Sequence, residues 1–187
     1  MTTDFTPGEP VESTPDEPLS FGAACALPSA EAVRTGPNLD ERKRIVNGIR
    51  TVAMLGASAT ESRASYFVAT YLLSSTDYEV YFVNPFGTEI LGRPVYPSLA
   101  DLPVVPDCVD VFRRPADLPE ALAETLKVGA KVFWLQLGLY DAALGAEAAA
   151  AGLDVVMDRC LKIEHARFHG GLHLAGFDTG VIDSRRF

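Results

Sequence analysis

Five short apolar runs, separated by segments of helix length, are the feature that most constrains the fold of this chain. Each run is too short for a buried helix and is dominated by Val, Leu, Phe and other strand-forming residues. The runs cover residues 51–55, 79–83, 109–112, 131–135 and 153–157. Strands that alternate with helices predict parallel pairing through right-handed crossovers. The sequence therefore predicts an α/β fold, with a doubly wound, mostly parallel, five-stranded sheet and helices on both faces.

Helix start and stop signals support this alternation. Asp40 is suited to cap a short helix that runs through Gly48, and residues 63–75 carry apolar side chains at helical spacing. Pro115 and Gly129 are suited to the first turn and the end of a later helix, and the alanine-rich run 141–151 is closed by Gly152. Residues 86–106 contain four prolines and predict a loop-rich connection rather than a full helix.

Composition divides the chain into one domain and two flanking segments. Residues 1–38 hold six prolines among acidic and small residues, a composition that buries too little apolar surface to offset the ordering of the chain. They predict a flexible N-terminal arm, followed by a single domain over residues 39–167. Residues 168–187 are expected to pack on the domain or on a partner subunit, which leaves a homo-oligomer open.

Charge and cysteine usage narrow the environment and the partners. Five of the nine excess negative charges lie in residues 1–20, so the body is only weakly acidic and lacks the basic surface that nucleic-acid binding needs. Cys25, Cys108 and Cys160 are odd in number and have no C-x-x-C spacing, which favours a reducing compartment. No signal sequence or membrane-length apolar run is present, so we expect a cytoplasmic protein without a membrane partner.

The stretch VAMLGASATES, residues 52–62, suggests a ligand site after the first strand. In an open parallel sheet, ligands bind beyond the carboxyl ends of the strands, where helix N-termini offer unpaired amides. Gly56 permits a tight turn, and Ala57 and Ser58 allow close approach to the backbone. Arg63 and Ser65, near the start of the next helix, add a cation and a hydroxyl.

Polar or special residues also follow the other strands, and together they strengthen the prediction of a ligand site. They are Asn84-Pro85, Arg113, Gln136 with Gly138, and Asp158. A nicotinamide cofactor site usually has an acidic residue after the second strand, where this chain has Asn84, and the first loop lacks the full G-x-G-x-x-G pattern. Both departures favour another adenine nucleotide that presents its phosphates to the first loop.

Several blocks of the sequence, taken in order, resemble a known family. These blocks are GASATESRASYFVATYLL, VNPFGTEILGRPVYPSLADLP, VDVFRRP, FWLQLG and VVMDRCLKIEHAR, which span residues 45–167 approximately. The chain resembles the small bacterial coenzyme A-binding proteins, which are similar to the nucleotide domain of succinyl-CoA synthetase alpha subunits. The resemblance implies a Rossmann-like domain with coenzyme A as its cofactor.

The resemblance also implies a role for each site residue. Gly56, Ala57 and Ser58 would contact the phosphates with support from Arg63 and Ser65. Asn84 and Pro85 would lie beside the adenosine, and Arg113, Gln136 and Gly138 would belong to the rest of the crevice. The chain has neither the further domain nor a phosphorylated histidine after it, so binding without ligase activity is expected and no catalytic residue is assigned.

Two alternatives remain open at this stage, and the sequence does not identify the physiological ligand as free coenzyme A, an acyl thioester or another nucleotide. One is an NAD(P)-binding oxidoreductase or redox sensor, and the other is a regulatory interaction module. A metal site at His165, His169 and His173 is disfavoured because Gly170-Gly171 interrupts any helix that would align them. The roles of these histidines, of Cys160 and of the N-terminal arm stay open.

Overall fold

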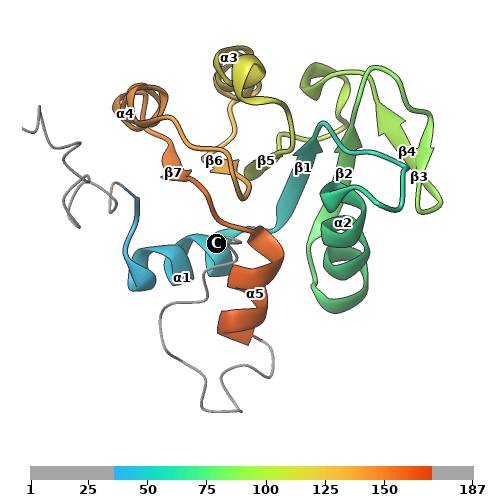
Figure 1. The fold of residues 1–187 in the computed structure, drawn as a ribbon, viewed down its shortest axis with the longest axis horizontal. Helices are drawn as coiled ribbons and strands as arrows, with labels where there is room; N and C mark the ends of the chain where they lie inside the picture. The colour runs from blue at the N-terminus through green and yellow to red at the C-terminus, as the bar shows by residue number, and fades with distance from the viewer. Residues whose placement is uncertain (1–35, 170–187) are drawn as a thin grey trace, which may run out of the picture. The chain divides into compact units, whose positions relative to one another are not determined.

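The computed structural model describes residues 36–169, and their elements follow the predicted alternation (Figure 1). The helices are α1 (Leu39–Gly48), α2 (Ala64–Ser75), α3 (Leu118–Val128), α4 (Ala142–Ala150) and α5 (Leu161–His169), with 3₁₀ turns η1 (Leu99–Asp101) and η2 (Pro115–Asp117). The strands are β1 (Thr51–Leu55), β2 (Glu79–Val83), β3 (Glu89–Ile90), β4 (Arg93–Tyr96), β5 (Cys108–Val111), β6 (Val132–Leu135) and β7 (Asp154–Val156).

The sheet has the order β3-β4-β2-β1-β5-β6-β7, and every pair is parallel except β3 with β4. From β1 the chain adds strands first on the β2 side and later on the β5 side. The direction of winding therefore reverses between β1 and β5, and a doubly wound sheet places its ligand crevice beyond the carboxyl ends of the strands at such a reversal. The doubly wound fold is confirmed.

Two separate cores hold the helices against the two faces of the sheet, as Figure 1 shows. On one face, α1, α2 and α5 cover Met54, Phe82 and Trp134, which are fully buried. On the other face, α3 and α4 cover residues of the opposite strand parity, such as Leu55 and Phe133. Strands buried on both faces must be apolar throughout, which explains why they stood out as continuous runs in the sequence.

Helix ends follow local rules that the sequence displays. Asn38 caps α1 by accepting a hydrogen bond from the Glu41 amide, and the Glu41 side chain accepts one from the Asn38 amide in return, which is a capping box. Asp141 caps α4 in the same way by accepting from the Leu144 amide. Gly129 ends α3 with φ of +80°. The predicted cap at Asp40 is wrong by two positions, because the Asn38 side chain occupies that role.

The sheet has seven strands rather than the predicted five, since residues 86–106 contain β3 and β4. These two strands form a short antiparallel hairpin whose turn, Leu91-Gly92, has φ of +50° and +74°. Such turns usually carry Asn-Gly or Asp-Gly, because both residues need positive φ, which leucine rarely adopts. With Leu-Gly at this place, the sequence lacks the usual turn signal. Helix α5 was also not predicted, because its buried face carries Glu164, His165 and Arg167 among the apolar residues.

The two flanking segments were predicted for residues 1–38 and 168–187, and they lie almost wholly outside the described residues, as do Cys25 and His173. Within residues 36–169, no helix is long and apolar enough to cross a membrane.

Candidate functional site

The loop after β1 lies against the loop after β5 at the point where the winding of the sheet reverses. The Gly56 amide donates to the Val83 carbonyl at 2.8 Å, and the Phe112 amide donates to the Leu55 carbonyl at 2.8 Å. Gly56 has φ of +87°, and a Cβ added there would lie 3.2 Å from the Phe112 carbonyl carbon and 3.3 Å from the Arg113 amide nitrogen. Glycine is therefore required both by its backbone conformation and by this close approach.

Ser65 braces the first loop from within α2. Its hydroxyl accepts a hydrogen bond from the Ser58 amide at 3.1 Å, and the Ser65 residue is only 4 % exposed. The Ser58 hydroxyl in turn accepts from the Thr60 amide at 3.1 Å. Ser58 and Ser65 are thus brought together, but their hydrogen bonds order the loop.

Free backbone donors lie slightly further along the same loop. The amides of Ala59, Ser62 and Ala64, all in exposed residues, have no hydrogen-bond acceptor among the described residues. Arg63 is the N-cap residue of α2 and makes no side-chain cap, and the first turn of α2 has no acidic side chain. The start of α2 therefore combines the positive end of the helix dipole with an exposed arginine, and no acidic side chain in its first turn offsets them.

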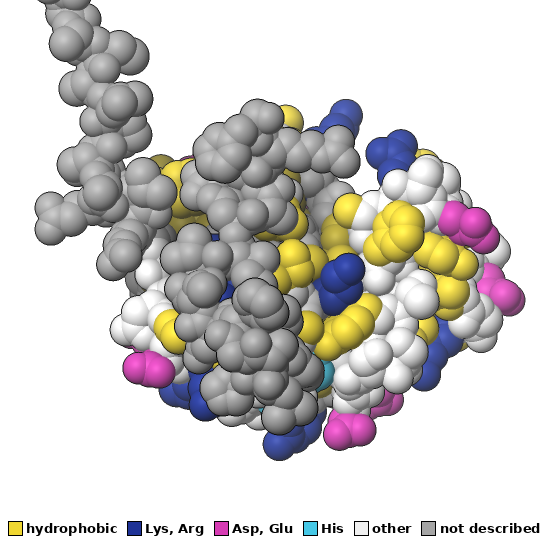
Figure 2. Space-filling model, turned by 60° about the horizontal axis from the view of Figure 1, so that its bottom comes forward, with side chains coloured by type: hydrophobic (Ala, Val, Ile, Leu, Met, Phe, Trp, Pro, Cys, Tyr) yellow, Lys and Arg dark blue, Asp and Glu magenta, His cyan; other side chains and the backbone are white. Residues whose placement is uncertain are grey.

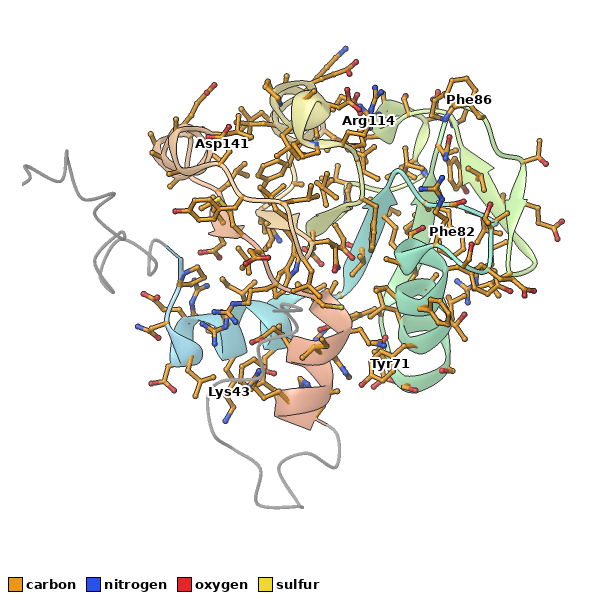
Figure 3. All side chains as sticks on the ribbon, in the orientation of Figure 1. Lys43, Tyr71, Phe82, Phe86, Arg114 and Asp141 are labelled. Atoms are coloured by element: carbon orange, nitrogen blue, oxygen red, sulfur yellow. The ribbon has the colours of Figure 1, made fainter. Side chains whose placement is uncertain are left out.

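Asn84 joins the loop after β2 to the loop after β1. Its side-chain Nδ2 donates to the Ala57 carbonyl at 2.6 Å, and its Oδ1 accepts from the Phe86 amide at 2.9 Å. The next residues, Pro85 and Phe86, are exposed, and the Phe86 side chain projects outward in Figure 3 with 96 % of its surface exposed. An exposed aromatic ring at a strand's carboxyl end offers a stacking surface beside the first loop.

Arg113 lies under the first loop, but its guanidinium is held by α3. Nη1 is 3.0 Å from Glu124 Oε1 and 3.4 Å from Glu120 Oε2. Its Cγ would lie 3.2 Å from a Cβ at position 56. The neighbouring Arg114 side chain, labelled in Figure 3, is exposed and pairs with Asp117 at 2.9 Å. The structure therefore brings Arg113 to the predicted crevice with its charge already paired to two carboxylates.

Gln136 and Gly138 belong to a second cluster after β6. Gln136 is 6 % exposed, and its Nε2 donates to both carboxyl oxygens of Asp110, at 2.8 and 3.0 Å. The Gly138 amide donates to Asp158 Oδ1 at 2.8 Å, and Asp158 itself has φ of +52°. Gln136 therefore points to a buried partner, and Gly138 orders the loop together with Asp158.

Asp110 is the residue of this region that the sequence reasoning missed. It is fully buried as the next-to-last residue of β5, and burial raises the pKa of its carboxyl to about 8, although the hydrogen bond from Gln136 opposes this shift. A buried carboxyl with a raised pKa at the carboxyl end of a parallel sheet is typical of functional sites. The same pKa shift also occurs where a neutral carboxyl forms a buried hydrogen-bonded pair. The available signal was an acidic residue inside the apolar run CVDV.

The cysteines and histidines on the described chain do not form a reactive or metal-binding group. Burial raises the pKa of both the Cys108 and Cys160 thiols, which disfavours the thiolate. His165 lies against Tyr71, whose hydroxyl is 3.2 Å from Nδ1, and stacks on His169. Within residues 36–169, no cluster of three or more His, Cys, Asp or Glu residues could hold a metal ion.

A separate groove of about 460 Å³ lies along the β7 edge of the sheet. Residues of α1, α4 and β7 line it, together with Met157 directly after β7, and none of the predicted site residues does. In the sheet order, β5 and β6 lie between β7 and β1, so this groove is separate from the candidate nucleotide site after β1.

Comparison with known proteins relates about 70 % of this chain to shorter proteins that are matched over almost their whole length. The model of the family described as "CoA binding domain" matches residues 50–166. The uncharacterized protein YneT of Bacillus subtilis (strain 168) is 35 % identical over 130 residues, which cover 70 % of this chain and 96 % of YneT.

Solved structures agree with this relationship. A hypothetical protein from Pyrococcus horikoshii OT3 is 37 % identical, with a TM-score of 0.67 over 71 % of this chain and 93 % of that protein. A Thermus thermophilus protein, cell-free ID.343, is 36 % identical, with a TM-score of 0.66 over 71 % of this chain and 99 % of that protein.

Proposed function

This chain belongs to the CoA-binding domain family, and on that premise we propose that it binds coenzyme A or an acyl-coenzyme A, with the phosphates at the loop after β1 and the start of α2. The observation that carries the proposal is the set of unpaired amides at Ala59, Ser62 and Ala64, beside the Arg63 side chain. Backbone donors at a helix N-terminus, without an acidic side chain in the first turn, form a site for phosphate groups.

The hydrogen bonds of the loop modify which atoms would contact the ligand. Gly56 and Ser58 have their amides paired, so they would shape the loop, and the phosphates would meet the exposed amides that follow. Glycine is therefore needed at position 56 for the shape of the loop, whether or not a ligand is bound. The exposed Phe86 ring and the adjoining Pro85 provide apolar surface for the adenine.

Surface character is consistent with a ligand that is anionic at one end and apolar elsewhere. In Figure 2, where the bottom of Figure 1 comes forward, a Lys or Arg side chain (blue) lies near the middle of the face among hydrophobic side chains (yellow). Coenzyme A combines phosphates with a long, weakly polar pantetheine arm. Local cations within apolar surface suit such a molecule, despite the formal charge of −9 on the whole chain.

Asn84 argues against a nicotinamide cofactor. A dinucleotide site needs an acidic side chain at this place to accept hydrogen bonds from the ribose hydroxyls. Here the Asn84 oxygen already accepts from the Phe86 amide and one N–H is donated to the Ala57 carbonyl. The side chain therefore has no free acceptor group equivalent to a carboxylate.

Isothermal titration of the full chain with coenzyme A, NAD⁺ and ATP at one ionic strength tests the proposal. We expect coenzyme A to bind at least about 10-fold more tightly than the other two, a difference of about 1.4 kcal/mol. Tighter binding of NAD⁺ than of coenzyme A would overturn the ligand assignment and restore the oxidoreductase alternative.

A carboxylate placed at the start of α2 should change the stability of the protein and its affinity for coenzyme A in opposite directions. Ala64→Asp puts a negative charge in an exposed first turn, so we expect it to raise the free energy of unfolding by about 0.3–1 kcal/mol through the helix dipole. The same charge should weaken coenzyme A binding by about 10-fold or more, because it competes with the phosphates. Titration and chemical denaturation measure the two effects.

Ala142→Asp is the matched control, since Ala142 is the exposed first residue of α4. We expect it to leave coenzyme A affinity unchanged. If Ala64→Asp also binds coenzyme A with wild-type affinity, the phosphates do not lie at the start of α2.

A further inference from the structure

Three charged side chains are buried between α1 and α5, away from the predicted nucleotide site. Arg42 on α1 is 7 % exposed, and Glu164 and Arg167 on α5 are 1 % and 4 % exposed. Arg42 Nε donates to Glu164 Oε2 at 2.9 Å, and Arg167 Nε lies 3.4 Å from Glu164 Oε1. Figure 1 shows the two helices side by side at the bottom of the domain. Two guanidinium groups share one carboxylate, so the group carries a net positive charge.

The hydrogen bonding of the two arginines differs. Arg42 also donates from Nη1 to the Pro37 carbonyl at 2.7 Å, so it has two acceptors. In Arg167, the Nε, Nη1 and Nη2 atoms are all buried and none of them makes a hydrogen bond. Its contact with Glu164 is electrostatic only, because no hydrogen bond joins the two side chains.

A buried guanidinium in this condition is unfavourable. A guanidinium is a cation with five N–H donors and no acceptor of its own. Burying an ion without a well-aligned partner is strongly unfavourable, even where another charge is nearby. The C-terminal end of α5 supplies a favourable dipole to Arg167 in its last turn, but a dipole does not satisfy the N–H groups of the guanidinium.

We propose that Arg167 is the binding site of one oxyanion group, a carboxylate or a phosphate, that completes an Arg42–Glu164–Arg167–anion network between α1 and α5. The anion would neutralise the excess charge and accept from the planar fork of N–H groups, a geometry that fits carboxylate and phosphate oxygens. Two sources share this chemistry. One is the carboxylate of Asp178 or Asp183, which follow Arg167 by 11 and 16 residues, and the other is a free oxyanion from solution.

The test uses thermal unfolding of the full chain with and without tens of millimolar inorganic phosphate, at constant ionic strength. A free anion site predicts that phosphate raises the Tm of the wild type by at least about 2 °C and that of Arg167→Met by nothing, since ligands stabilise only the state that binds them. A site filled by the chain predicts no phosphate effect. In that case Asp178→Asn or Asp183→Asn should lower the Tm in the wild type and have no effect in Arg167→Met.

Two further variants keep the test decisive. Arg44→Met is the control, because Arg44 forms an exposed ion pair with Asp154 at 2.7 Å and its loss should not alter the response to phosphate. Arg167→Lys replaces Arg167→Met if the latter does not fold, since it keeps the charge but loses the fork. The proposal is overturned if phosphate has no effect that depends on Arg167 and neither aspartate shows coupling to Arg167.

Discussion

Gly56→Ala is expected to lower the free energy of unfolding by about 2–4 kcal/mol and to abolish measurable coenzyme A binding. Position 56 has φ of +87°, where an L-residue is strained. The added methyl group would also meet backbone atoms of Phe112 and Arg113 at 3.2–3.3 Å, and backbone cannot turn away as a flexible side chain can. The loops after β1 and β5 would have to separate, which would displace the amides that we propose for the phosphates.

Gly152→Ala isolates the second of these effects. Gly152 has φ of +92°, close to that of Gly56, but a Cβ there would meet nothing within 4 Å. We expect a cost of about 1–2 kcal/mol from backbone conformation alone and unchanged coenzyme A affinity. Chemical denaturation and titration of both variants give the comparison. Equal destabilisation by the two substitutions would show that the approach of the two loops at the reversal is not tight.

Asp110 is expected to make the stability of the protein fall as the pH rises. Burial raises its pKa in the folded state from 3.8 to about 8. Between these values the unfolded chain loses the proton and the folded protein keeps it, so the folded state is progressively disfavoured as the pH rises. This residue should therefore reduce the free energy of unfolding by about 1.4 kcal/mol per pH unit across this window, and the reduction should level off above pH 8.

Asp110→Asn removes the titration and keeps an oxygen to accept from Gln136 Nε2. Denaturation of both proteins at several pH values between 4 and 8 should therefore show a difference in stability that shifts steadily in favour of the variant as the pH rises. Any constant cost of the new amide group changes the offset but not this slope. Parallel pH profiles for the two proteins would mean that Asp110 is ionised in the folded state at neutral pH.

Asp107 is a control for Asp110, because its pKa is lowered and its effect on stability should change with pH in the opposite direction. Burial tends to raise its pKa, but hydrogen bonds from Lys131, Arg50 and Thr51 outweigh burial and lower it. A lowered pKa gives stability that is present above the unfolded value and lost on acidification. Asp107→Asn should therefore destabilise the protein at neutral pH and have a smaller effect below about pH 3.

The sequence predicts the local structure where a single residue or a short run determines it. The five central strands were predicted from continuous apolar runs, and the helices between them from periodicity and from end signals such as Gly129. The sequence does not predict a conformation that depends on neighbours. The β3–β4 hairpin turns at a leucine with positive φ. Helix α5 has charged and polar residues on its buried face, so its sequence lacks a clear apolar stripe.

For the candidate site too, the sequence predicts the features that are local, and the tertiary structure decides those that depend on contacts. The sequence alone determined the order of the five central strands and of the helices between them. With it came the position of Gly56 and its small neighbours at the end of the first strand, because strand ends follow from local hydrophobicity and chain geometry. Tertiary structure alone decided which groups are free. Ser65 and Asn84 are engaged with the loop, Arg113 is paired with α3, and Gln136 faces Asp110. Hydrogen-bond partners are chosen by distances between segments far apart in the chain, and no pattern within one segment records those distances.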